Sequence, residues 1–125
     1  MSVPSLTSLD QIRESMSALG ASGLAIPPPS FTTMETEVID YQPGDAETNL
    51  GARMTVRIPV LKRWQNPMGL MQGGALAMAV DNVIGPLSYL VAPPSSTTQL
   101  ALTYLAPVTP DLEFITVEGV FVHRS

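Results

Sequence analysis

The chain has 125 residues and a net charge of −5, with eleven acidic and six basic side chains, no cysteine and one histidine. The lack of cysteine excludes disulfides, a zinc–thiolate site and a cysteine nucleophile, and a single histidine excludes a multi-histidine metal site within one chain. The acidic balance argues against binding to nucleic acid or to an anionic membrane surface. The length fits one domain. Charged residues make up only 14% of the chain, well below the usual share, which indicates that oligomerisation covers part of the surface.

The N-terminal region predicts a short amphipathic helix over residues 8–19. Ser8 and Gln11 match a capping box at its start, and Gly20 can end it. Four apolar side chains share one face of this helix: Leu9, Ile12, Met16 and Leu19. Residues 21–33 hold three successive prolines and predict a loop or extended connector. There is no signal-peptide pattern, so a cytoplasmic location is expected.

Two strands are predicted next, over residues 34–41 and 52–60, joined by a polar turn over residues 42–49. The first strand alternates between two sides, with Val38 and Asp40 on one and Ile39 and Tyr41 on the other. The second alternates more regularly, and one of its sides carries Met54, Val56, Ile58 and Val60. This pattern is typical of a half-buried antiparallel strand.

A loop over residues 61–74 leads into one long helix over residues 75–91. The helix is apolar almost all round, which predicts that other structure wraps it. Pro86 removes a backbone hydrogen bond and predicts a kink or an interruption. The stretch is not expected to span a membrane, because an aspartate such as Asp81 near the bilayer centre costs about 2.5–3.5 kcal/mol.

The C-terminal part predicts turns over residues 93–96 and 106–111 and strands over residues 97–105 and 112–123, with Gly119 as a candidate bulge. The last strand alternates, with Phe114, Thr116 and Glu118 opposite Ile115 and Val117. The whole order is helix, strand, strand, long helix, strand, strand. It predicts an α+β fold in which an antiparallel sheet wraps around one central helix.

Four segments, in this order, resemble hotdog-fold thioesterases of the phenylacetate-pathway type. Residues 66–81, which run Asn-Pro-Met-Gly-Leu-Met-Gln-Gly-Gly-Ala-Leu-Ala-Met-Ala-Val-Asp, are similar to that family's pattern of Asn, then His-Gly-Gly, then Asp seven residues later in the central helix. Residues 97–100, 104–108 and 119–124 resemble parts of the later strands. The resemblance implies a single hotdog domain over residues 1–125, with a helix and connector over 1–33 and the hotdog core over 34–125.

Two departures from that family pattern stand out. Gln72 occupies the position of the usual histidine. The family also has two further strands after the one that ends near Arg124, so we expect either a truncated sequence or a sheet completed in another way.

The resemblance implies that the chain hydrolyses an acyl-CoA thioester, with Asp81 as nucleophile or general base. From the residues alone, a charge on an apolar helix is costly unless it is used or satisfied, and an exposed or hydrogen-bonded aspartate is the alternative. The resemblance assigns the oxyanion donor to the backbone N–H of Gly73, at the positive end of the helix dipole. Asn66 would orient water or hold the carbonyl, and Gln72 can donate a hydrogen bond but cannot shuttle a proton.

Other residues are candidates for binding the substrate. Gly74 lies beside Gly73 at the start of the helix, and the acyl group could be lined by Met68, Leu70, Met71 and Met78. By resemblance to the family's strand end, His123 and Arg124 could reach a coenzyme A phosphate. The alternatives are that the glycines only allow a tight turn, that Asn66 is a turn residue before proline, that the methionines are core, and that the last residues are a solvated terminus. In either case the two glycines are expected to need to be small. No metal is expected, and no cofactor beyond the CoA of the substrate.

The resemblance also implies a homodimer or a dimer of dimers, in which Asn66, Gln72 and Gly73 of one subunit face Asp81 of the other. Two other functions remain open. The chain could bind an acyl ligand without turnover, which Gln72 and the short C-terminal end favour. It could also be a hotdog dehydratase, although that activity usually needs a histidine near the central helix.

Overall fold

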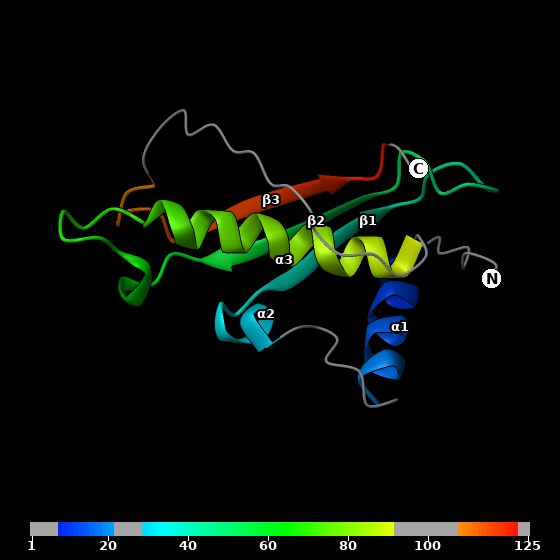
Figure 1. Cartoon of the computed structure of the whole chain (residues 1–125), viewed down its shortest axis with the longest axis horizontal. Coiled ribbons are helices and arrows are strands. Elements are labelled where there is room, and N and C mark those ends of the chain that lie inside the picture. Colours follow the sequence, from blue (N-terminus) through cyan, green and yellow to red (C-terminus); the bar gives the residue numbers. More distant parts are fainter. Residues whose placement is uncertain (1–7, 22–28, 92–107, 123–125) are drawn as a thin grey trace.

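The computed structural model describes residues 8–21, 29–91 and 108–122. Within them, a three-stranded antiparallel sheet in the order β1-β2-β3 packs one face against the long helix α3 (Figure 1). The elements are α1 (Leu9–Ala21), α2 (Pro29–Thr33), β1 (Glu37–Gln42), β2 (Arg53–Pro59), the 3-10 turn η1 (Lys62–Trp64), α3 (Gly73–Val91) and β3 (Phe114–Val120). The predicted α+β class is therefore confirmed. The predictions for residues 93–96 and 97–105 lie outside the described residues.

The central strand β2 has the alternation that the sequence predicts. Met54, Val56 and Ile58 are completely buried beneath α3. Arg53 and Arg57 lie on the opposite, exposed face of the sheet. There they form ion pairs to the neighbouring strands, Arg53 to Glu118 at 3.3 Å and Arg57 to Glu37 at 2.7 Å. Pairs of this kind on the surface contribute little to stability, so the sheet is held mainly by its buried face.

The predicted alternation of β1 is wrong, because the strand carries a bulge. The pairing of β1 with β2 shifts between Val38 and Asp40, which makes Ile39 an extra residue. As a result Val38 and Tyr41 are both buried on the same face, although the sequence pattern places them on opposite sides.

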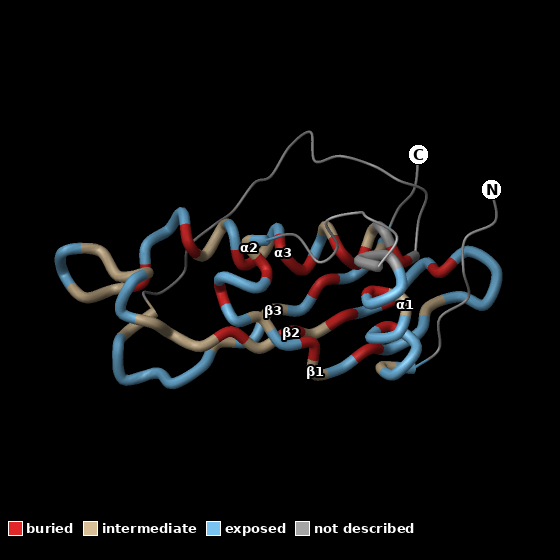
Figure 2. Tube along the Cα trace, turned by 90° about the horizontal axis from the view of Figure 1, so that it is seen from below, coloured by how far each residue is buried: buried red, intermediate tan, exposed pale blue. Residues whose placement is uncertain are grey.

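Helix α3 is buried along one stripe rather than all round. The buried side chains recur every three or four residues: Ala75, Ala79, Asn82, Val83, Leu87 and Leu90. Figure 2 shows buried segments of α3 on the side that faces the strands. The opposite face leaves Met78, Asp81 and Ile84 exposed, so the described elements cover this helix on one side only.

Proline 86 does not end α3, which continues to Val91. Proline has no N–H to give to the carbonyl of Asn82 one turn earlier, so one helical bond is missing there. Packing of the buried stripe against the sheet holds the helix together across this gap. The helix also begins two residues before the predicted start, at Gly73.

Gly119 allows close packing of β3 on α3 and is not a bulge. It pairs in regular register with Met54 of β2. A Cβ atom at this position would lie 3.2 Å from Cγ1 of Val83 and 3.4 Å from Cδ2 of Leu87. The predicted bulge is therefore wrong, and the glycine instead brings the helix and the strand together.

The N-terminal elements extend the core at one end of the sheet. The Ser8 hydroxyl caps α1 by accepting a bond from the Gln11 N–H at 3.2 Å, as predicted. Ile12 and Met16 of α1 are buried in the same core as β2 and α3. A short helix, α2, lies within the predicted connector, where Pro29 suits the first helical position. None of the described helices is long and apolar enough to cross a membrane.

Candidate functional site

Asn66 organises the loop that leads into α3. Its Oδ1 accepts hydrogen bonds from the N–H groups of Met68, at 2.9 Å, and Leu70, at 3.1 Å. Its own N–H donates to the carbonyl of Leu70, and the N–H of Gly69, at φ +81°, donates back to the Asn66 carbonyl. This is the turn role of asparagine. A contact with a substrate carbonyl would therefore fall to Nδ2, at the other end of the amide.

Gln72 closes this loop at its base. Its N–H donates to the carbonyl of Trp64 at 2.7 Å, and its Nε2 donates to the carbonyl of Gln65 at 3.2 Å. Gln65 and Met71 also form an antiparallel bridge. These contacts place the end of the loop next to its beginning. Helix α3 begins at the residue after Gln72.

The two glycines at the start of α3 are exposed. A Cβ atom on Gly74 would meet nothing within 4 Å. The expectation that Gly74 has to be small is therefore wrong for the isolated chain. Any such requirement would come from a molecule that packs against the beginning of α3.

Asp81 lies on the exposed face of α3, and the described structure does not bury it. It is eight residues beyond Gly73, which corresponds to about 12 Å along a helix axis and about 80° around it. One chain therefore does not bring the predicted carboxylate and the predicted oxyanion donor together. Both residues also have an interaction within their own chain.

The buried polar residue of α3 is Asn82, which was not predicted from the sequence. It is only 3% exposed, and its Oδ1 accepts a bond from the hydroxyl of Ser30 at 2.8 Å. Its Nδ2 lies 3.6 Å from the sulfur of Met34. The helical repeat could have identified Asn82 as the buried residue. Asn82 lies three residues after Ala79 on the buried stripe, whereas Asp81 does not lie on that stripe.

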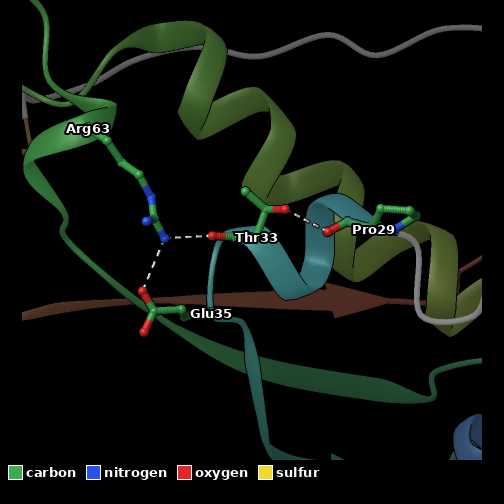
Figure 3. Close-up of polar contacts among 4 residues, drawn as sticks. All are labelled: Pro29, Thr33, Glu35 and Arg63. Atoms are coloured by element: carbon green, nitrogen blue, oxygen red, sulfur yellow. Dashed lines mark hydrogen bonds and ion pairs between the residues drawn. The ribbon is translucent and has the colours of Figure 1, made fainter.

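Arg63 connects the loop to the segment that follows α2 (Figure 3). Its guanidinium donates to the carbonyl of Thr33 at 2.8 Å and to the carboxylate of Glu35 at 3.1 Å, and it lies over the ring of Trp64. Glu35 adopts a positive φ of 54° in this tight turn. Together with the bond between Ser30 and Asn82, this contact attaches the α2 segment both to the middle of α3 and to the loop before it.

The predicted substrate-binding methionines differ in their surroundings. Met71 is 5% exposed and belongs to the core, whereas Met68 at the tip of the loop is 78% exposed. Met78 is partly exposed on the same face of α3 as Asp81. His123 and Arg124 lie outside the described residues. In the described ranges, no three His, Asp or Glu side chains are grouped so that they could hold a metal ion.

Comparison with known proteins gave no match: no protein-family model, no curated protein and no solved structure matches this chain.

Proposed function

We propose that this chain is one subunit of a hotdog-type thioesterase that hydrolyses an acyl-CoA to a free acid and CoA. One observation carries the proposal. Asp81 is an acidic side chain on an exposed and otherwise largely apolar face of the long helix, and the same helix begins at Gly73 directly after a hydrogen-bonded loop. These are the two groups that the sequence resemblance implies for the reaction.

The separation along α3 supports a site shared between two copies. Because about 12 Å separates Asp81 from Gly73 along the helix, a thioester held at Gly73 of one copy would need Asp81 from a second copy. The apolar side chains that flank Asp81 on its exposed face, Met78 and Ile84, suit contact with a second copy. A homodimer or a dimer of dimers would then have two equivalent sites.

In such a site the thioester carbon forms a bond to oxygen as its bond to sulfur breaks. Asp81 would take a proton from the attacking water, or attack the carbonyl itself before water releases the acid. The start of α3 at Gly73 would stabilise the oxyanion, because the positive end of the helix dipole lies there. Asn66 Nδ2 would hold the carbonyl, and the proton taken from water would leave with the CoA thiol.

Release of free thiol from a panel of acyl-CoA esters tests this proposal. Wild-type protein is expected to release thiol, and Asp81→Asn is expected to lower kcat by at least about 100-fold. Asp111→Asn, a change of the same kind at another exposed acid, serves as the control and keeps wild-type turnover. Thiol release that survives Asp81→Asn would contradict the assigned carboxylate.

One observation favours a second candidate, an acyl-ligand-binding protein without turnover. Asn66 Oδ1 and Gln72 Nε2 both form hydrogen bonds within the loop, and Gln72 cannot shuttle a proton. Titration calorimetry separates the two functions, because a binding protein would take up an acyl-CoA with equal affinity in wild type and Asp81→Asn and release no thiol.

A further inference from the structure

Glu35 occupies a position after α2 where the backbone favours glycine. The Thr36 N–H donates to the carbonyl of Phe31 at 3.0 Å. The Glu35 N–H donates to the carbonyl of Thr32, also at 3.0 Å. This pair of bonds is the Schellman motif that ends many helices, and its left-handed residue is usually glycine. Glu35 is that residue, with φ +54°, and its Cβ atom makes the left-handed backbone unfavourable.

The contact that the glutamate gains in return is with Arg63. The guanidinium of Arg63 donates to the Glu35 carboxylate at 3.1 Å and to the Thr33 carbonyl, in the last turn of α2, at 2.8 Å (Figure 3). We call these two contacts the Arg63 clamp. Both side chains of the ion pair are more than half exposed, and such pairs stabilise a fold little. Stability therefore does not explain the strained acid, and residues held in strained conformations cluster at functional sites.

The end of α2 gives the clamp a firm base. Phe31 and Met34 are buried in the core that α3 shares with the sheet. The Ser30 hydroxyl also donates to Oδ1 of Asn82, in the middle of α3, at 2.8 Å. A group that is held by Arg63 is thereby held relative to α3 itself.

On its other side the clamp holds the segment that leads into α3. Arg63 belongs to the turn η1, and its guanidinium lies 5.4 Å from the centre of the Trp64 ring. The Trp64 carbonyl accepts the Gln72 N–H at 2.7 Å, and the Gln72 carbonyl accepts the Leu76 N–H at 3.0 Å. The carbonyl of Gln72 and the N–H of Gly73 belong to one planar peptide group. The contacts of Gln72 therefore also set the direction of the Gly73 N–H.

We propose that Glu35 and Arg63 are positioning residues, which hold the Gly73 N–H in the direction that oxyanion stabilisation needs. This role rests on the proposed function, in which the start of α3 stabilises the oxyanion of a thioester. Neither side chain has to touch the substrate, because each acts through η1 and the peptide group before Gly73.

Replacement of Glu35 by glycine separates positioning from stability. Glycine suits the left-handed backbone, and only an exposed ion pair is lost, so the midpoint of urea unfolding should stay the same or rise. Loss of such a pair shifts a local equilibrium about 2- to 5-fold. The kcat for thiol release, on the acyl-CoA that wild type hydrolyses fastest, should therefore fall about 2- to 5-fold. KM should stay the same, because an oxyanion donor acts only in the transition state.

Two further variants are compared with Glu35→Gly. Glu37→Gln breaks a different exposed ion pair, with Arg57 on the sheet, and should keep the wild-type kcat. Arg63→Lys keeps the positive charge but replaces the planar fork by a single ammonium group. Its kcat should therefore lie between that of wild type and that of Arg63→Met. A role of the clamp in folding alone would instead lower the urea midpoint of Glu35→Gly and leave the kcat of the folded protein unchanged.

Amide exchange at Gln72 tests the clamp without a substrate. Its N–H is released from the Trp64 carbonyl when the loop moves, so exchange should be about 2- to 5-fold faster in Glu35→Gly and unchanged in Glu37→Gln. Unchanged exchange in Glu35→Gly would overturn the clamp, and faster exchange with a wild-type kcat would overturn its role in the reaction. A wild-type chain that releases no thiol would contradict the proposed function, whereas faster exchange at Gln72 would still support the clamp.

Discussion

Replacement of Gly119 by valine tests the contact that holds α3 on the sheet. The Cβ atom alone would lie 3.2 Å from Val83 and 3.4 Å from Leu87, closer than or at the limit of ordinary contact, and the two extra methyl groups would add to the overlap. Overpacking of this kind costs about 1–3 kcal/mol. Loss of a glycine from a strand returns about 0.5–1 kcal/mol. From the middle of both ranges, the expected net destabilisation is about 1 kcal/mol.

Urea unfolding followed by circular dichroism measures this change as a shift of the midpoint at constant slope. Thr116→Val, on the exposed face of the same strand, is the matched control and should change stability by less than about 0.5 kcal/mol. In the Gly119→Val background, Val83→Ala should recover part of the loss, with a coupling of about 0.5–3 kcal/mol. A Gly119→Val protein as stable as wild type would refute the close packing of β3 on α3.

Three further predictions follow from the described contacts. Gly74→Ala should leave stability unchanged or raise it by about 0.5–1 kcal/mol, because its Cβ meets open space; a loss of thiol release at unchanged stability would show that a ligand or a second copy packs there. Asn82→Ala should destabilise the fold by about 1–3 kcal/mol in urea, because it leaves the Ser30 hydroxyl without its acceptor. In the Asn82→Ala background, Ser30→Ala should lower stability little further. If the two losses of stability were simply additive, that would contradict the hydrogen bond between Ser30 and Asn82. Burial raises the pKa of Tyr41 above its usual value of 10.0, so the contribution of Tyr41 to stability should be constant below about pH 10 and should fall as pH rises further. Tyr41→Phe should remove that fall at little cost, because the buried hydroxyl has no hydrogen-bond partner among the described residues; an unchanged pH profile would show that other groups cause it.

The sequence predicted most reliably those elements whose pattern is set by their own neighbours. The regular alternation of β2 and the capped, one-sided helix α1 follow from local periodicity, and both appear as predicted. The bulge in β1 could not be predicted in this way, because it is defined by the pairing with β2 rather than by the residues of β1 themselves. The role of Gly119 likewise depends on side chains of α3 more than 30 residues away.

The same difference between features set by neighbouring residues and features set by distant contacts applies to the candidate site. Asn66 and the following turn are recognisable from sequence, since asparagine before proline favours a bonded turn. The sequence did not reveal which polar residue of α3 is buried. Both faces of this helix are largely apolar, so composition alone does not distinguish the buried face from the exposed one. Helix phase does separate Asp81 from Asn82. The contact of Arg63 with Thr33 and Glu35 joins parts of the chain about 30 residues apart and has no local signal.

Mixing two inactive variants tests the shared site most directly. Asp81→Asn removes the carboxylate, and Asn66→Ala alters the loop, so each homodimer would have two defective sites. If Asp81 of one copy serves the loop of the other, a random heterodimer contains one intact site, and the refolded equimolar mixture should regain roughly a quarter of the wild-type rate of thiol release. A mixture as inactive as its two components, beside an active wild type, would contradict a site built from two copies.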